Sequence, residues 1–476
     1  MSIISINLSD PSHNSFYFPI LILLIILYLI INAIKKFYNR KNNIEDISLK
    51  TVDDDKNYPY NLEYMSKSLK SRFIIYVFAT CPIMTIFPYL YTLFLLVHKF
   101  SRGEIAILYL IEILSQILFS PIAINLSNKY GRKKILEYIN WSIILNLFLR
   151  MKGSRLLVYL AQILSGIGSG SVFTICQNWL DCEIKRMFYE YEEEGINFKK
   201  KLVKNCIIIN SIIYLIVSII CAIFYTYFGI NAPFWINIII NLIGIICIWI
   251  LWDDNKAFPY ENIVTEIKEA FNELKKPVLL LLYGFIDGIL ITLINIFLFA
   301  WTPILKESTS GYMNIGFIFI LMDVTKNIGI SIYDIVINKY NFDYYISLFG
   351  CIFIQGLFFY LINIHNSFLW RMLYFCIIFG CIGFFNSLKW NIISTNFEEK
   401  HKQILFNLFN LPFNFVFIAF IYVDTFTIAT IAGILSTLAI FINLCLIGYT
   451  QFQKKENNNN NDNDNNGYKL ILAEDK

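Results

Sequence analysis

The sequence predicts an all-α polytopic membrane protein in which twelve transmembrane helices form two sets of six, preceded by one extra N-terminal helix. Hydrophobic residues make up 57% of the chain and charged residues only 16%, against roughly 25% charged in an ordinary soluble domain. A soluble fold of this size could not bury so much apolar surface, whereas a lipid-facing fold need not bury it. The apolar runs are also too long for membrane strands and do not alternate, which favours helices.

Thirteen apolar runs approach the roughly 20 residues that a helix needs to cross about 30 Å of hydrocarbon. The first lies at about 17–36 and has no Lys or Arg in the 16 residues before it, whereas four basic residues stand at its end (Lys35, Lys36, Arg40 and Lys41). This favours an uncleaved anchor helix with its N-terminus outside over a signal peptide. The other twelve runs lie near 72–97, 104–127, 133–150, 154–178, 205–229, 233–252, 277–302, 312–337, 343–364, 369–390, 404–422 and 425–450.

The positive charges give the expected orientation. If 37–71 faces the cytoplasm, 31 of the 39 Lys and Arg residues fall on the cytoplasmic side and seven on the outer side. Cytoplasmic loops of membrane proteins carry such an excess of basic residues. These seven are placed in the outward loops: Lys99, Arg102, Arg150, Lys152, Arg155, Lys306 and Arg371. The remaining one, Lys326, falls inside a span.

A hydrophilic stretch at 253–276 divides the twelve later spans six and six. Counting 72–97 as the first of these twelve spans, the loop after the second span begins Asn128-Lys129-Tyr130. The loop after the eighth begins Asn338-Lys339-Tyr340. This echo at matching places indicates duplication of a six-helix unit, as in several transporter folds. We expect an anchor and linker at 1–71, bundles at 72–252 and 277–450 joined by a cytoplasmic linker at 253–276, and a disordered Asn-rich tail at 451–476.

Two related six-helix halves joined by a cytoplasmic linker resemble the major facilitator superfamily. The loop after the second span is similar to the superfamily's helix 2–3 motif, although Asn128 stands where an acidic residue is usual. In the superfamily this loop latches the cytoplasmic side by charge pairing, so the resemblance implies a gating role for the matching residues. These residues are Lys129, Gly131, Arg132 and Lys133.

A narrower resemblance covers about 72–450. The segments Gly103-Glu104-Ile105-Ala106-Ile107-Leu108-Tyr109 and Phe299-Ala300-Trp301-Thr302-Pro303-Ile304-Leu305, together with Trp179 at the end of the fourth span, are similar to the eukaryotic molybdate-anion transporters. That branch also carries an extra N-terminal segment. The resemblance implies that the substrate is the molybdate oxyanion.

Three charges typical of that branch are replaced in this chain. Gln162 stands at an Arg position in the fourth span, Gln177 at an acidic position, and Asn410 at an Arg position in the eleventh span. Amide donors can hold an oxyanion when a positive charge is nearby. We therefore expect these three residues and Asn295 to be polar lining of the substrate path.

Charged residues inside the spans mark the candidate site, because a charge at mid-membrane costs roughly 2.5–3.5 kcal/mol on insertion scales. Asp287 falls in the seventh span, and Asp323 and Lys326 fall three residues apart on one face of the eighth. We expect Lys326 to supply the positive charge missing elsewhere, while Asp323 or Asp287 titrates. A neutralised pair that only packs is the alternative. Glu112 in the second span is either a coupling acid or a helix–helix hydrogen-bond partner.

Several residues predict features of the helices themselves. Gly166 and Gly170 are spaced for close packing of the fourth span against a neighbour. Proline residues should interrupt the first span, at Pro82 and Pro88, and the eleventh, at Pro412. Interface anchoring is the expected role of the tryptophans near span ends. These are Trp179, Trp301 and Trp390.

We predict a secondary active transporter that moves a small solute by alternating access of the two bundles, with the molybdate oxyanion as candidate. A membrane sensor without flux and a transporter of another solute are the alternatives. The four His residues are isolated and the ten Cys lack metal-ligand spacing, so neither a metal site nor an enzyme is expected. No ATP-binding motif is present, which indicates an ion gradient or facilitated diffusion as the energy source.

The expected surroundings follow from the same features. We expect a monomer in the lipid bilayer, without a cofactor and without a nucleic-acid partner, because the chain carries no basic stripe. No lipidation or retrieval signal is visible. We expect the plasma membrane rather than an internal membrane.

Overall fold

The computed structural model describes residues 24, 25, 28, 68–70, 72–188, 192–256, 278–309, 313–340, 342–396 and 430–450. Within these ranges the chain is helical with short connections, and no strand is present. Ten helices in this part of the chain are long and apolar enough to cross a membrane by length and composition. The predicted all-α membrane fold is therefore confirmed.

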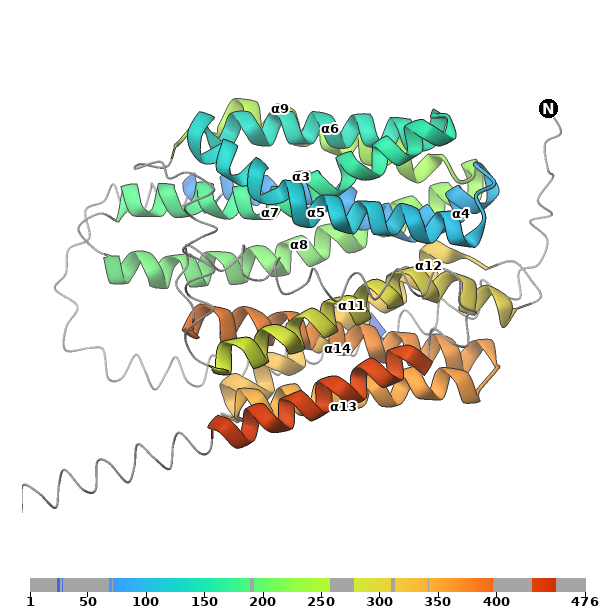
Figure 1. The fold of residues 1–476 in the computed structure, drawn as a ribbon. Coiled ribbons are helices and arrows are strands. Elements are labelled where there is room, and N and C mark those ends of the chain that lie inside the picture. Colours follow the sequence, from blue (N-terminus) through green and yellow to red (C-terminus); the bar gives the residue numbers. More distant parts are fainter. Residues whose placement is uncertain are drawn as a thin grey trace, which may run out of the picture.

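The helices form two groups, drawn from blue to green and from yellow to red in Figure 1. The first group consists of α3 (Tyr76–Thr85), α4 (Phe87–Leu96), α5 (Arg102–Tyr130), α6 (Arg132–Lys152), α7 (Arg155–Met187), α8 (Glu192–Phe228) and α9 (Ala232–Leu251). The second group consists of α11 (Val278–Glu307), α12 (Ile315–Tyr333), the π-helix η1 (Asp334–Lys339), α13 (Tyr344–Ile364), α14 (Phe368–Asn396) and a helix at Thr430–Thr450. We call them the first bundle and the second bundle.

Most predicted spans correspond to described helices, with α3 and α4 together forming the first span of the first bundle. The predicted span at 404–422 lies outside the described residues, and with it Pro412. Of the predicted anchor helix at 17–36, only residues 24, 25 and 28 are described, and these are helical. The inter-bundle linker beyond 256 and the tail from 451 also lie outside, so the predicted segment boundaries stay predictions.

The first span is interrupted where its prolines predict. Pro82 lies inside α3 and Pro88 opens α4, with Ile86 between the two helices. A proline has no N–H to donate and its ring crowds the preceding turn, which explains the break. The Thr85 hydroxyl at the break lies 2.9 Å from the Cys81 carbonyl oxygen and 2.6 Å from Asn237 Oδ1 on α9.

The most extensive helix packing in each bundle joins equivalent helices, α5 with α7 and α12 with α14. Gly166 of α7 lies against the Glu112 carbonyl group of α5, and Gly329 of α12 lies against the Gly380 carbonyl group of α14. Small residues allow backbones to approach this closely. The predicted packing role of Gly166 is confirmed, and the matching pairs agree with the repeat indicated by the Asn-Lys-Tyr echo.

We expect Gly329→Val to destabilise the protein strongly, because a Cβ there would overlap the Gly380 carbonyl oxygen. Overpacking of this kind costs typically about 1–3 kcal/mol or more. The matched control is Gly350→Val on α13, where an added Cβ meets no atom within 4 Å. The apparent melting temperature of detergent-solubilised protein measures both. Equal melting temperatures for the two variants would contradict the close packing of α12 on α14.

Arg371 corrects one prediction, because it is buried in the first turn of α14 and not placed in an outer loop. Its guanidinium donates to the His365 carbonyl oxygen at 3.0 Å, to Asn366 Oδ1 at 2.8 Å and to the Ile304 carbonyl oxygen at 3.4 Å. Carbonyl groups at the ends of helices lack partners within the helix. Arg371 therefore ties the end of α11 to the α13–α14 connection.

Candidate functional site

The two bundles meet through aromatic side chains at what we call the outer end, the end that the predicted orientation places outside the membrane. The Phe299 ring of α11 lies 6.0 Å from the Tyr91 ring of α4 and 5.8 Å from the Tyr109 ring of α5. The rings of Phe87 and Phe319 lie 6.3 Å apart across the same boundary. Edge-to-face contacts such as those of Phe299 stabilise packing beyond the apolar area that they bury.

Closer contacts join the start of α12 to the first bundle. Asn314 Nδ2 donates to Thr226 Oγ1 of α8 at 3.4 Å. Gly316 lies against the Tyr89 hydroxyl and against Ala222, where an added Cβ would overlap both. The outer end is thus a tight contact between the bundles.

The predicted pair on the eighth span is present in the middle of α12. Lys326 Nζ lies 3.8 Å from Asp323 Oδ1, with 25% of the lysine and 13% of the aspartate side chain exposed. The ammonium also lies 5.9 Å from the centroid of the Phe379 ring of α14, within reach of a cation–π contact. The ion pair is long and partly accessible, so its ammonium could accept another partner.

Asp287 does not share this pair, because its partner is Lys389, which was not among the predicted site residues. Lys389 Nζ of α14 lies 2.8 Å from both carboxylate oxygens of Asp287, whose side chain is 0% exposed. The pair lies in the inner part of α11 and near the inner end of the span formed by α14. A buried carboxylate requires such a partner.

Glu112 and Gln162 converge on Arg150, for which the prediction of an outer loop is wrong. Arg150 lies in the last turn of α6 and is 2% exposed. Its Nη2 donates to Glu112 Oε2 at 3.2 Å and to Gln162 Oε1 at 2.7 Å, and Ser165 Oγ donates to Glu112 Oε1 at 2.5 Å. The signal that could have found it is Glu112 itself, since a carboxylate inside a span requires a nearby cation.

The other predicted lining residues are only partly placed. Gln177 on α7 and Asn295 on α11 are half-buried. Asn410 lies outside the described residues.

The predicted gating loop binds the start of the inter-bundle linker through Arg132. Arg132 Nη1 donates to Asn255 Oδ1 at 3.2 Å, and its backbone N–H donates to the Asn255 carbonyl oxygen at 3.0 Å. Arg132 Nη2 also donates to Asn128 Oδ1 at 3.2 Å. Asn128 therefore supplies an acceptor oxygen where the superfamily motif has an acid, but not a negative charge.

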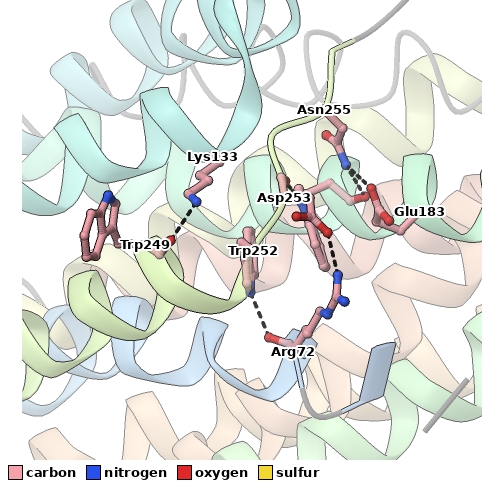
Figure 2. A network of polar contacts seen from close by, with 8 residues as sticks. Arg72, Lys133, Glu183, Trp249, Trp252, Asp253 and Asn255 are labelled. Atoms are coloured by element: carbon pink, nitrogen blue, oxygen red, sulfur yellow. Dashed lines mark hydrogen bonds and ion pairs between the residues drawn. The ribbon is translucent and has the colours of Figure 1, made fainter. Parts of the chain in front are cut away.

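The linker start is held from two further sides. Asn255 Nδ2 donates to Glu183 Oε1 of α7 at 2.9 Å, and Arg72 Nη1 forms an ion pair of 2.7 Å with Asp253 Oδ2 (Figure 2). We call residues 252–255 with these contacts the linker clasp. The contacts described here all lie within the first bundle, so a latch to the second bundle stays a prediction.

Trp179 belongs to the linker clasp and is buried, which corrects the prediction that it anchors at the membrane interface. Its ring stacks on Trp252 with centroids 4.0 Å apart, and its Nε1 donates to the Asp253 carbonyl oxygen at 2.9 Å. Trp301 is buried as well, so the same prediction is wrong there. The side chain of Trp390 lies outside the described residues.

The two predicted gating lysines make separate contacts. Lys133 Nζ donates to the Trp249 carbonyl oxygen at the end of α9, at 2.7 Å (Figure 2). Lys129 Nζ lies 5.1 Å from the centroid of the Tyr130 ring. Lysine near the C-terminal carbonyls of a helix is stabilising, which gives Lys133 a structural role at this position.

We expect Gly131→Ala to weaken the linker clasp, because Gly131 has φ +116° and an added Cβ would overlap the Asp254 carboxylate. Gly229→Ala is the matched control, since Gly229 also has a positive φ, +81°, but no atom within 4 Å of an added Cβ. A positive φ strains an L-residue in either variant, and the strain is larger at Gly131, whose φ of +116° and ψ of +133° lie outside the left-handed helical region. The apparent melting temperature should fall further for Gly131→Ala. A fall no larger than that of the control would contradict the tight contact with Asp254.

No group of three or more His, Cys, Asp or Glu among the described residues is arranged to hold a metal ion. What the arrangement offers is a set of carboxylate–cation pairs between or along helices, below an outer contact between two bundles. Ionisable residues inside spans are typical of solute and ion pathways.

Comparison with known families matches residues 37–370 to a family described as sugar transporters with twelve transmembrane helices. Comparison with curated proteins gave no match. Among solved structures, a variant of the nucleoside transporter NupG has a TM-score of 0.63 and 11% identity, covering 80% of this chain and 99% of that chain. The POT family transporter PepTSo has a TM-score of 0.60 and 12% identity, covering 84% and 99%. An auto-inhibited POT family peptide transporter has a TM-score of 0.58 and 9% identity, covering 83% and 97%.

Proposed function

Because the chain belongs to this family of twelve-helix transporters in the major facilitator superfamily, we propose that it moves a small polar solute by alternating access of its two bundles. The chain is a transporter and not an enzyme, because the family to which it belongs is a family of transporters. A sensor without flux is not favoured, because the similar structures are also transporters. The observation that carries the proposal is the Asp323–Lys326 pair in mid-span, below an outer end where the bundles touch.

In the proposed cycle, the described conformation has its outer end closed. Tyr91 and Tyr109 packed on Phe299, and Asn314 bonded to Thr226, separate the pair on α12 from the outer side. The solute would then reach Lys326 from the cytoplasmic side. Opening the outer end requires the start of α12 to separate from α4 and α8, as rocking of one bundle against the other does.

The first substrate candidate is the molybdate oxyanion that the sequence resemblance implies. The supporting observation is the weak hold on Lys326, whose ammonium lies 3.8 Å from Asp323, compared with 2.8 Å between Lys389 and Asp287. An oxyanion could replace the Asp323 carboxylate as the partner of the ammonium. Charge-assisted hydrogen bonds to an oxyanion are among the stronger ones available to a site.

The second candidate is a neutral hydroxylated solute, the class named in the family's description. The supporting observation is charge balance, because three cations inside the spans have a carboxylate within 4 Å: Lys326 with Asp323, Lys389 with Asp287, and Arg150 with Glu112. A site of zero net charge does not favour an anion. Ion pairs and aromatic rings such as Phe379 suit hydroxyl groups and apolar ring faces.

Counterflow in proteoliposomes tests the proposal. Vesicles preloaded with unlabelled solute would be given the labelled form of molybdate, sulfate, a hexose or a nucleoside. Saturable molybdate counterflow with sulfate competition supports the oxyanion, and hexose or nucleoside counterflow supports the neutral solute. Failure of folded protein to catalyse counterflow of any compound in a broad metabolite mixture would overturn the proposed function. The plasma membrane location and the monomeric state stay predictions from the sequence.

A further inference from the structure

Just below the outer end, four polar side chains from three helices of the first bundle form a cluster that alternating access at Lys326 does not use. It consists of Glu112 on α5, Arg150 on α6, and Gln162 and Ser165 on α7. Gln162 is 1% exposed and Arg150 2%, whereas the Glu112 side chain keeps 19% exposure. Glu112 is therefore the member of the cluster that solvent can reach.

The cluster has more hydrogen-bond donors than acceptors. A guanidinium can only donate, so the Gln162 atom 2.7 Å from Arg150 Nη2 must be the oxygen, and Gln162 Nε2 must be a donor. Both Gln162 Nε2 and Arg150 Nε are buried without an acceptor among the described residues. A buried donor left unmet costs about 1–3 kcal/mol. Two such unmet donors, on side chains that are hydrogen-bonded to each other, indicate that an acceptor is missing.

Charge balance restricts what that acceptor can be. With Glu112 ionised, the cluster is neutral, and an added anion would leave one uncompensated negative charge in a buried place. If Glu112 takes up one proton from water as a monovalent anion enters, the net charge stays zero. Protonation also releases Arg150 Nη2, which now donates to the Glu112 carboxylate, and leaves the Ser165 hydroxyl free to donate elsewhere.

We infer that this cluster is a binding site for a small monovalent anion, held by Arg150, Gln162 and Ser165 when Glu112 carries a proton. The site lies in the first bundle, apart from Lys326 on α12, and its existence does not depend on which solute is transported. Tyr109, one helical turn from Glu112 on α5, packs on Phe299 of the second bundle. An anion bound at this site would therefore lie close to the Tyr109–Phe299 contact that closes the outer end.

The other ionisable groups around the cluster are few among the described residues. From α6 comes Arg150, from α4 comes Tyr91, and Tyr109 lies on α5 itself, while Gln162 and Ser165 of α7 do not titrate. His98 Nε2 lies 2.6 Å from the Arg150 carbonyl oxygen. Because histidine titrates near neutral pH, a His98→Gln variant has to accompany any test of pH dependence.

Nitrate binding to the purified full-length protein in lipid nanodiscs tests this inference, with binding measured by calorimetry at about pH 5.5 and about pH 7.5, on either side of neutrality. The wild type and His98→Gln should both bind nitrate more tightly at the lower pH. Glu112→Gln mimics the protonated carboxyl and should bind nitrate equally at both. Gln162→Met leaves the Arg150–Glu112 pair in place and should weaken binding by about tenfold or more, since a hydrogen bond to a charged group is lost.

Two control variants separate this site from others. Arg155→Gln removes an exposed arginine whose Nη1 lies 3.2 Å from Glu104 Oε1, the same length as the Arg150–Glu112 contact, and it should leave nitrate binding unchanged. Lys326→Ala removes any nitrate held on α12, and the part of nitrate binding that depends on Gln162 and on pH should survive it. The inference is overturned if nitrate does not bind, if binding survives Gln162→Met unweakened, if Glu112→Gln keeps the pH dependence, or if Lys326→Ala abolishes binding. Solute counterflow is a separate readout, so either proposal can fail alone.

Discussion

Replacing Lys389 with leucine is expected to lower the free energy of unfolding by about 3–5 kcal/mol, since breaking a buried pair from one side leaves an uncompensated buried charge. Asp287 is fully buried and both of its oxygens lie 2.8 Å from Lys389 Nζ. Without the ammonium, the carboxylate must either take up a proton or stay charged in an apolar place. Both alternatives weaken the packing of α11 on α14.

A double variant separates the pair's net contribution from the cost of leaving one charge alone. Asp287→Leu together with Lys389→Leu should recover most of the stability lost in Lys389→Leu, because replacing both members of a buried pair with apolar groups is often neutral. The control is Arg72→Gln, which breaks the exposed ion pair with Asp253 and should cost less than about 1 kcal/mol. Apparent melting temperatures in detergent measure all three. A double variant as unstable as Lys389→Leu would show that the pair does not account for the loss.

The second large effect concerns Lys326. Lys326→Ala should reduce solute counterflow by at least about tenfold, the loss expected when a charged hydrogen-bond partner is removed from a bound ligand. Its melting temperature should fall less than that of Lys389→Leu, because Lys326 is 25% exposed and its contact with Asp323 is 3.8 Å long, whereas Asp287 is fully buried beside Lys389. Lys306→Ala, at the exposed end of α11, is the control and should transport normally.

The alternative role of this pair, neutralised packing, makes a different prediction. If Asp323 and Lys326 only neutralise each other, then Asp323→Asn combined with Lys326→Gln should transport as well as the wild type. A binding role predicts that the double variant stays as inactive as Lys326→Ala. Counterflow rates per folded molecule decide between the two, and full activity of the double variant would refute a binding role for Lys326.

Local patterns account for what the sequence could predict. Hydrophobic run length predicted the helices, the prolines predicted the break at Ile86, and the three-residue spacing predicted that Asp323 and Lys326 share a helix face. Each of these features depends on residues close together in the chain. The family and the paired packing of α5 with α7 and α12 with α14 agree with the six-plus-six prediction.

Contacts between helices could not be predicted in the same way. The partner of Asp287 lies 102 residues away and that of Glu112 lies 38 residues away. Which cation meets which carboxylate depends on how each helix is rotated about its axis, and one sequence does not define that rotation. Arg150 was misplaced for a related reason, because a long side chain near a helix end can point into the bundle as well as into water.

The linker clasp shows the same limit. The resemblance of the loop at 128–134 implied gating by charge pairing, whereas Arg132 binds the amide oxygens of Asn128 and Asn255 in the structure. Trp179 follows a polar residue at the end of a span, which is typical of an interface anchor. It is buried because the linker folds back over α7 and brings Trp252 onto its ring. Nothing in the local sequence of α7 encodes that return.

The central claim, alternating access with a closed outer end, is tested most directly by locking that end. Asn314→Cys and Thr226→Cys would be combined, because Asn314 Nδ2 lies 3.4 Å from Thr226 Oγ1 across the two bundles. The background would lack the exposed Cys445 and the partly exposed Cys182, Cys247 and Cys381. The control joins Glu104→Cys and Arg155→Cys within the first bundle, where the native Glu104 Oε1 and Arg155 Nη1 atoms lie 3.2 Å apart. Cross-linking with a short thiol-specific reagent, followed by counterflow before and after reduction, is the measurement. The account predicts that the lock across the bundles stops counterflow and that reduction restores it, while the control pair transports throughout. Undiminished counterflow through fully cross-linked Asn314→Cys/Thr226→Cys protein would contradict it.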